Sequence, residues 1–188
     1  MPQPHSGPIQ KLKPGQVAPD FALPDTDGKA VRLADLLKPH KLCVVLFICN
    51  HCPYVQAYIP RLIDMQRELS KRGVTLVGIN SNDPAGYPED STEKMKHYAQ
   101  AWGMNFPYLH DTDQRVADGF GAQRTPEIFL LDADCVVRYE GGIDDCYQNA
   151  ARVTRRPLLD AINDLLEGRP VAQPTTFAIG CSLKRKHD

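Results

Sequence analysis

The sequence has almost no net charge and no long apolar segment. Its 22 lysines and arginines nearly balance its 23 aspartates and glutamates, which leaves a net charge of −1. Composition therefore does not indicate nucleic acid or an anionic membrane surface as a partner. No run approaches the ~18 apolar residues that a membrane-spanning helix needs, and residues 1–15 lack the apolar core of a secretory signal. We expect a cytoplasmic protein with neither nucleic acid nor membrane as a partner.

The length of 188 residues is enough for one domain with a sizeable core. Residues 1–16, rich in Pro, Gln and Lys, are expected to be a loose N-terminal leader. Residues 17–170 should form the domain, and residues 171–188 a polar C-terminal tail. The sequence shows no internal repeat and no second domain.

Apolar runs and helical periodicity alternate along the middle of the chain, which predicts parallel strands joined by crossover helices. A late pair of strands around an Asp-Ala-Asp turn predicts an antiparallel hairpin. The expected class is α/β, a central mixed sheet with helices on both faces and an N-terminal β-hairpin extension. Strands are expected at residues 17–25, 30–33, 41–48, 74–80, 106–110, 126–132 and 135–140, and helices at 53–72, 91–102, 112–120 and 154–166, with a short helical turn at 34–38.

Six cysteines are present, and two of them form a C-x-x-C pair, Cys49 and Cys52. In a chain of this size without a secretion signal, such a pair favours a catalytic or metal site over a disulfide scaffold. The pair lies between a buried strand and a helix that begins at Pro53. Helix N-terminal N–H groups favour an anion and lower the pKa of a cysteine there, and the thiolate is the reactive form. We therefore expect a redox-active centre at Cys49 and Cys52.

The order of elements, with C-x-x-C after the first core strand and Thr125-Pro126 before the late hairpin, resembles the thioredoxin fold. The Ala-Pro-Asp-Phe motif at residues 18–21 and the insert at about 83–105 are similar to the redoxin branch. That branch is the alkyl hydroperoxide reductase/thiol-specific antioxidant family, which includes the peroxiredoxins. The CNHCPYV motif at residues 49–55 is similar to that of a bacterial subgroup of redoxin-domain proteins, and the resemblance covers the chain from about residue 14.

The resemblance implies roles for the two cysteines. In thioredoxins a kink proline follows the nucleophilic cysteine by eight positions, and here Pro60 follows Cys52 by eight. In peroxiredoxins a proline follows the peroxidatic cysteine directly, as Pro53 follows Cys52. Both comparisons assign Cys52 as the nucleophile and Cys49 as its resolving cysteine, the reverse of the usual order in a thioredoxin C-x-x-C.

Other positions support or depart from the family pattern. A protonated His51 would favour the thiolate. Thr125-Pro126 resembles the cis-proline loop that lies beside the disulfide and presents backbone groups to the partner. The buried acid of thioredoxins is replaced by Leu46, and the arginine of a peroxiredoxin site would fall at Pro126, with Arg124 two places away.

We predict a thiol-dependent oxidoreductase that needs no cofactor. The Cys52 thiolate would attack a disulfide and Cys49 would resolve the mixed disulfide. The expected substrates are protein or small-molecule disulfides or peroxides, with an external thiol reductant such as a thioredoxin. One alternative is a peroxiredoxin-like antioxidant peroxidase in which Cys52 becomes a sulfenic acid. Others are a copper- or zinc-binding module using Cys49, His51 and Cys52, for which no fourth ligand is evident, and a non-catalytic thioredoxin-like binding domain.

The remaining four cysteines have different expectations. Cys181, in the tail, is a further candidate resolving cysteine that could fold back to Cys52 or Cys49. Cys146 follows two aspartates in a loop and could be exposed, with a smaller chance of a functional role. Cys43 and Cys135 are expected to be structural, as buried free cysteines usually are.

Overall fold

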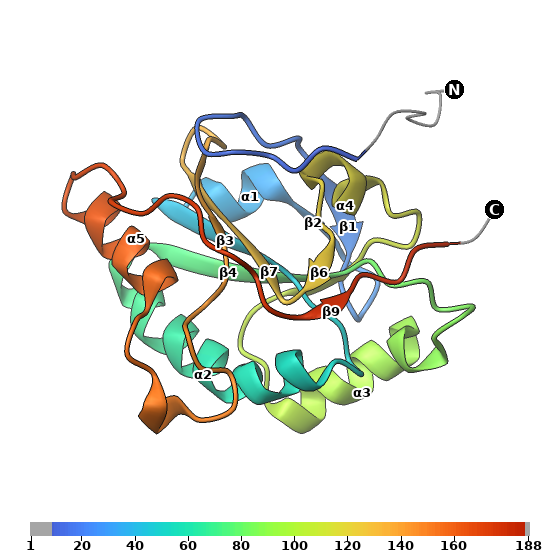
Figure 1. Ribbon diagram of the computed structural model, residues 1–188. Helices are drawn as coiled ribbons and strands as arrows, with labels where there is room; N and C mark the ends of the chain where they lie inside the picture. The colour runs from blue at the N-terminus through green and yellow to red at the C-terminus, as the bar shows by residue number, and fades with distance from the viewer. Residues whose placement is uncertain (1–8, 187–188) are drawn as a thin grey trace.

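A five-stranded mixed sheet forms the centre of the protein, whose computed structural model describes residues 9–186 (Figure 1). The strand order is β5-β4-β3-β7-β8. β3 pairs in parallel with β4, and β4 with β5, whereas β3–β7 and β7–β8 are antiparallel. This arrangement confirms the predicted parallel centre and late antiparallel hairpin. The strands are β3 (Leu42–Phe47), β4 (Val74–Asn80), β5 (Tyr108–His110), β7 (Glu127–Asp132) and β8 (Val137–Gly141).

The two central parallel strands are buried along their whole length. Both are continuous runs rich in valine, leucine and isoleucine, the pattern of strands that are covered on both faces. A side chain at Gly78 in β4 would collide with Ile48, so a glycine at this position lets the loop after β3 lie close to the sheet. That loop carries the C-x-x-C pair.

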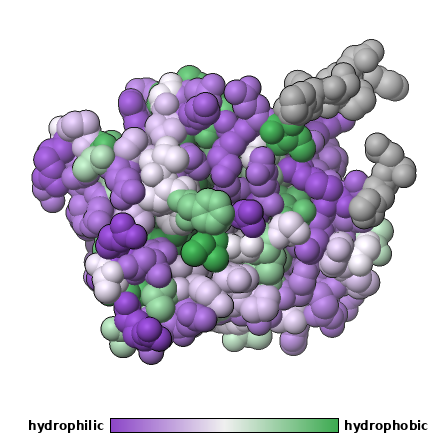
Figure 2. Space-filling view, viewed as in Figure 1, coloured by the Kyte–Doolittle hydropathy of each residue, from purple (hydrophilic) through white to green (hydrophobic). Residues whose placement is uncertain are grey.

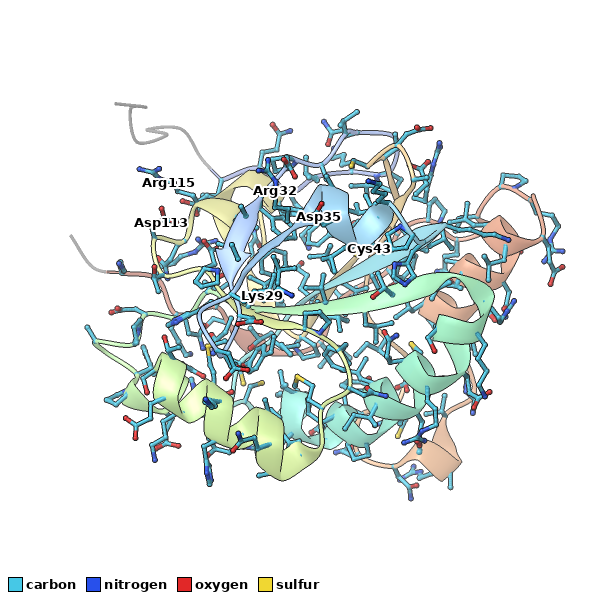
Figure 3. The ribbon with its side chains drawn as sticks, turned by 180° about the vertical axis from the view of Figure 1, so that it is seen from behind. Lys29, Arg32, Asp35, Cys43, Asp113 and Arg115 are labelled. Atoms are coloured by element: carbon cyan, nitrogen blue, oxygen red, sulfur yellow. The ribbon has the colours of Figure 1, made fainter. Side chains whose placement is uncertain are left out.

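Helices cover both faces of the sheet, as predicted. On one face lie α2 (Pro53–Leu69), α3 (Thr92–Trp102) and α5 (Pro157–Leu166), whose buried side chains share a core cluster with alternate residues of β3. The opposite face is covered by α1 (Leu33–Leu37), α4 (Arg115–Phe120) and the hairpin of β1 (Ala22–Pro24) with β2 (Ala30–Arg32), which lie above the sheet in Figure 1 and, seen from behind, in Figure 3. Cys43 lies in this second core.

α2 begins directly after Cys52, with Pro53 at its first position, where a missing N–H costs no helical hydrogen bond. The helix continues past Pro60 to Leu69. A 3-10 turn over Ser70–Arg72 follows, and Gly73, with a left-handed φ of 80°, ends it. The predicted helix over 53–72 therefore corresponds to α2 and this turn. Two further 3-10 turns are η2 (Pro88–Asp90) and η3 (Ala150–Arg152).

The described part of the N-terminal leader is bonded to the domain. The N–H of Leu12 donates to the carbonyl of Phe120 at 3.0 Å, and that of Gly15 donates to the carbonyl of Val137 at 2.8 Å. Lys11 forms an ion pair with Glu127. Residues 9–16 are thus not loose, because backbone bonds fix them; residues 1–8 of the predicted leader lie outside the described residues.

The tail also returns to the domain, through a short strand that the sequence did not predict. β9 (Cys181–Ser182) pairs antiparallel with β6 (Arg124–Thr125), the strand that precedes Pro126. Ala178 and Leu183 on either side of β9 are buried. In Figure 1 the red tail crosses the front of the molecule and reaches β6. Within the described chain, the helices are too short or too polar to cross a bilayer.

Candidate redox site

Cys52 lies at the N-cap of α2 and is fully buried. As a thiol it donates a hydrogen bond to the carbonyl oxygen of Thr125 at 3.1 Å. The Thr125-Pro126 peptide bond is cis, as the resemblance implied. Because β6 and the loop after β3 meet here, the structure brings Cys52, Thr125 and Pro126 together, with Pro53 as the first residue of α2.

Cys49 lies in the loop before α2 and is also fully buried. Its sulfur lies 3.4 Å from the hydroxyl oxygen of Thr125. A hydrogen bond with Cys52 raises the pKa of Cys49 above its ordinary value, and burial and the nearby Asp90 add to this rise. The thiol form of Cys49 is therefore favoured.

The same hydrogen bond acts in the opposite direction on Cys52. The pKa of Cys52 falls to about 4 because Cys49 donates to its sulfur; this effect and further hydrogen bonds from Cys181 and the Val55 N–H outweigh the rise that burial causes. The two cysteines thus have opposite pKa shifts, lowered for Cys52 on the helix side and raised for Cys49 on the loop side. A thiolate at neutral pH is the form that attacks a disulfide or a peroxide.

Cys181 is the third cysteine of the site. It pairs with Thr125 in the β6–β9 ribbon, and its sulfur lies 3.0 Å from that of Cys52. Burial and the neighbouring Cys52 raise the pKa of Cys181 to about 11. A side chain at Gly180 would collide with the carbonyl oxygen of Thr125, so the glycine allows this close approach. Unlike Cys49 and Cys52, Cys181 is partly exposed.

His51 lies between the two active-site cysteines in sequence, but its ring is directed towards a buried carboxylate. Its Nδ1 lies 2.6 Å from Oδ2 of Asp90, and its ring stacks on Tyr87 at 5.4 Å between centroids. Asp90, in η2, is fully buried. Its oxygens also accept hydrogen bonds from the Asn50 N–H, Asn80 Nδ2 and Asn82 Nδ2.

Sequence reasoning missed Asp90, because it lies in a polar insert among exposed acids and no local pattern distinguishes it. The buried acid expected from thioredoxins at position 46 is a leucine in the core. The structure nevertheless places a buried acid near Cys49, because Asp90 of η2 reaches this position. The only signal was three asparagines near the ends of the buried strands, Asn50, Asn80 and Asn82, whose amides need hydrogen-bond partners where they are buried.

Three of these side chains could hold a metal ion. Cys49, His51 and Asp90 each offer a ligand atom, and these atoms lie within 4.8 Å of one another. This set replaces the predicted combination of Cys49, His51 and Cys52, because the Cys52 sulfur is directed to Thr125 and Cys181. Both oxygens of Asp90 already accept hydrogen bonds, so a metal there would have to displace some of these donors.

The other candidate residues lie elsewhere or have other partners. Arg124 donates to the carbonyl of Gly180 at 3.3 Å and its guanidinium lies over the ring of Phe177, so the tail engages it. Burial raises the pKa of Cys43 to about 12, consistent with its predicted structural role. Cys146 is partly exposed, and its carbonyl accepts a hydrogen bond from Arg61.

Similarity to known proteins identifies the family of this chain. Residues 14–140 match the AhpC/TSA family. The chain belongs to this family. Peroxiredoxin Bcp of Escherichia coli is 34% identical over 113 residues, which are 60% of this chain and 67% of that protein. The thiol-disulfide oxidoreductase ResA of Bacillus subtilis is 26% identical over 66% of this chain and 65% of its own length.

Solved structures show the same architecture. An uncharacterised conserved protein from Geobacillus kaustophilus is 42% identical, with a TM-score of 0.87 over 93% of both chains. The peroxidoxin BcpB of Mycobacterium tuberculosis is 27% identical, with a TM-score of 0.58 over 68% of this chain and 83% of its own. The predicted thioredoxin-like α/β fold is confirmed, and this member of the AhpC/TSA family is a thiol-dependent oxidoreductase.

Proposed function

We propose that the protein is a thiol–disulfide oxidoreductase in which Cys52 is the nucleophile and Cys49 is the resolving cysteine. The observation that carries this proposal is the inequality of the two thiols: the pKa of Cys52 is lowered to about 4, while that of Cys49 is raised. The nucleophile must be a thiolate at neutral pH, and the resolving thiol must keep its proton until the mixed disulfide has formed.

The reaction has two steps. The Cys52 thiolate attacks one sulfur of a substrate disulfide, forms a mixed disulfide and releases the other sulfur as a thiolate. Cys49 then loses its proton and attacks the Cys52 sulfur, which gives a Cys49–Cys52 disulfide and releases the second substrate thiolate. The substrate thiolate released in the first step accepts that proton in this proposal. An external dithiol, for which a thioredoxin is the candidate, then returns two electrons.

A second candidate is a thiol peroxidase, and the similarity to peroxiredoxin Bcp favours it. The Cys52 thiolate would attack a peroxide oxygen, release an alcohol or water, and become a sulfenic acid. Attack by a second cysteine would then form a disulfide and release water. One observation argues against this candidate. A peroxiredoxin site needs an arginine near position 126, and Arg124, the nearest arginine in sequence, is hydrogen-bonded to the tail instead.

The test follows free thiols in the reduced, metal-free protein after stoichiometric addition of oxidised glutathione or, separately, hydrogen peroxide. Cys52→Ser should slow thiol loss with the disulfide by about 100-fold or more, whereas the control Cys146→Ser should react like wild type. The double variant Cys49→Ser/Cys181→Ser should stop at a stable mixed glutathione disulfide on Cys52. A Cys52→Ser protein that reacts as fast as wild type contradicts the proposal, and thiol loss with peroxide alone favours the peroxidase.

A further inference from the structure

The tail lies across the cysteine pair and is fixed there by many bonds. Before β9, the N–H of Thr176 donates to the carbonyl of Glu140 at 3.0 Å. After β9, the N–H of Leu183 donates to the carbonyl of Gln123 at 2.9 Å, and the N–H of Lys184 donates to Oδ1 of Asn82 at 2.8 Å. Cys49 and Cys52, both 0% exposed, are therefore covered by the tail in this arrangement, and a substrate disulfide reaches Cys52 only when the tail moves aside.

Cys181 is the member of the three-cysteine group that an external thiol can reach. It is partly exposed, and the chain on its N-terminal side presents Phe177 and Ile179, which are 73% and 55% exposed. Figure 2 shows an apolar patch in the middle of this face, along the tail segment that precedes β9 in Figure 1. A reductant that approaches this face meets the Cys181 sulfur before it meets the pair beneath.

We propose that Cys181 is the transfer thiol through which the buried Cys49–Cys52 pair receives electrons from an external dithiol reductant. This inference rests on the proposed function and adds that the external reductant attacks the sulfur of Cys181. The β6–β9 ribbon holds the Cys181 and Cys52 sulfurs 3.0 Å apart. A disulfide needs a separation of about 2.05 Å, so the two sulfurs must approach by about 1 Å to form the bond.

The exchange first moves the disulfide outward. The thiolate of Cys181 attacks the Cys52 sulfur of the Cys49–Cys52 disulfide. A Cys52–Cys181 disulfide forms, and the Cys49 sulfur leaves and takes up a proton. Cys49 is buried, and burial disfavours the charged form of a thiol, so the departing sulfur is stable once it has taken up the proton. The new disulfide has one partly exposed sulfur, that of Cys181.

The external dithiol then completes the transfer. Its first thiolate attacks the Cys181 sulfur, forms a mixed disulfide and expels Cys52 as a thiolate. A thiol of low pKa is the better leaving group. Attack on the partly exposed Cys181 sulfur therefore expels Cys52, the cysteine with the lowered pKa. The second thiolate of the reductant then attacks the reductant's first sulfur, which is bonded to Cys181 in the mixed disulfide, and expels Cys181. The reductant leaves as a disulfide, and all three cysteines are reduced.

The first experiment tests whether the Cys181–Cys52 bond forms. Cys49→Ser is oxidised with one equivalent of oxidised glutathione, digested, and analysed by mass spectrometry at several protein concentrations. We expect an intramolecular Cys52–Cys181 disulfide whose yield does not depend on protein concentration. A persistent glutathione adduct on Cys52, with Cys181 free, overturns the proposal but leaves Cys52 as the nucleophile of the proposed function.

The second experiment tests whether electrons enter at Cys181. Oxidised wild type, Cys181→Ser and the control Cys146→Ser are reduced by a thioredoxin in excess, and the return of free thiols is followed. We expect at least about a tenfold slower reduction for Cys181→Ser and no change for Cys146→Ser. Equal rates for all three proteins overturn the proposal.

Gly180→Ala provides a variant that keeps all six cysteines. The added methyl collides with the carbonyl of Thr125, so β9 and β6 must separate at this point, and we expect Cys181 to move away from Cys52. We expect this variant to be reduced as slowly as Cys181→Ser while its Cys52 thiolate still attacks oxidised glutathione. If the thioredoxin reduces Gly180→Ala as fast as wild type, the transfer role of Cys181 is contradicted. If Cys52 fails to attack oxidised glutathione in every variant, the proposed function is contradicted instead.

Discussion

The Nδ1 atom of His51 lies 2.6 Å from Oδ2 of Asp90, an acid with no solvent exposure. The other donors to Asp90 are one backbone N–H and two asparagine amides, so its carboxylate is surrounded by donors on both oxygens. A buried carboxylate is stable only when paired and hydrogen-bonded in this way. The pair thus joins the loop of Cys49 and Cys52 to the insert that contains η2.

Asp90→Asn should destabilise the fold. The carboxylate of Asp90 now accepts four hydrogen bonds. The asparagine amide has one oxygen and two N–H groups, so its N–H groups would face some of the donors that surround this position. We expect the free energy of unfolding to fall by about 2–4 kcal/mol, measured by urea denaturation of the reduced protein. Asp134→Asn, at an exposed position, is the matched control and should change it by less than about 0.5 kcal/mol. Equal effects of both variants would contradict the structural role of Asp90.

The Cys52 thiolate should be present at neutral pH. Because the pKa of Cys52 falls to about 4, the ultraviolet absorbance of the reduced protein should contain one thiolate per chain at pH 7. Cys52→Ser should remove that absorbance, and Cys43→Ser should not. An ordinary cysteine titrates near about 8.5, so a titration that begins only there would contradict the lowered pKa.

The same shift makes stability depend on pH. The pKa of Cys52 is lower in the folded protein than in the unfolded chain, so this group stabilises the fold fully above the unfolded pKa near about 8.5. That contribution decreases as the pH falls and is lost below about 4. The difference in unfolding free energy between reduced wild type and Cys52→Ser should therefore grow from acid to neutral pH. A difference that stays constant over this range would contradict the prediction.

Cys49 should be the main cause of the low Cys52 pKa, since its hydrogen bond has the largest effect. Cys49→Ala removes the donor, and we expect the thiolate of Cys52 to titrate at a higher pH, measured by the same absorbance. Cys49→Ser retains an O–H donor and should shift the titration less. If Cys49→Ala leaves the titration unchanged, the hydrogen bond from Cys49 is not the main cause of the low pKa of Cys52.

The central sheet could be predicted because its signals are local. The runs at 42–47 and 74–80 are long, apolar and β-branched, and Pro53 fixes the start of α2 within one residue. The confirmed Thr125-Pro126 cis bond came from resemblance, since an X-Pro step alone is cis in only about 5–6% of folded cases.

The parts of the site that no local pattern can place depend on contacts between distant residues. Asp90 approaches Asn50 across 40 positions, and Cys181 approaches Cys52 across 129. The tail appeared too polar for a core, yet backbone pairing with β6 holds it and only Ala178 and Leu183 are buried among its described residues. Two-residue strands such as β6 and β9 have no periodicity that a sequence pattern could reveal.

Phe120 should be a main support of the second core. Its ring lies 5.5 Å from that of Phe47 and 5.2 Å from that of Phe129, in edge-to-face contacts. Phe120→Ala should lower the unfolding free energy by about 3–5 kcal/mol, measured by urea denaturation, because it leaves a cavity among these rings. Phe177→Ala, at a ring that is 73% exposed, should cost less than about 1 kcal/mol. A smaller loss for Phe120→Ala than for Phe177→Ala would show that the rings do not form a packed cluster.

Metal removal separates the redox proposal from the metal-binding alternative. Cys49, His51 and Asp90 could supply three ligands, but Asp90 already accepts hydrogen bonds on both oxygens and Cys49 is favoured as a thiol, whereas a metal binds the thiolate. Prolonged treatment with a chelator should therefore leave the rate of reaction with oxidised glutathione unchanged, and titration with zinc should show weaker binding than a structural zinc site of four cysteine and histidine ligands. Stoichiometric zinc or copper that survives purification, together with loss of that metal in His51→Ala, would contradict this expectation. A matched His97→Ala variant, altered on the exposed side of α3, should not affect metal content in either case.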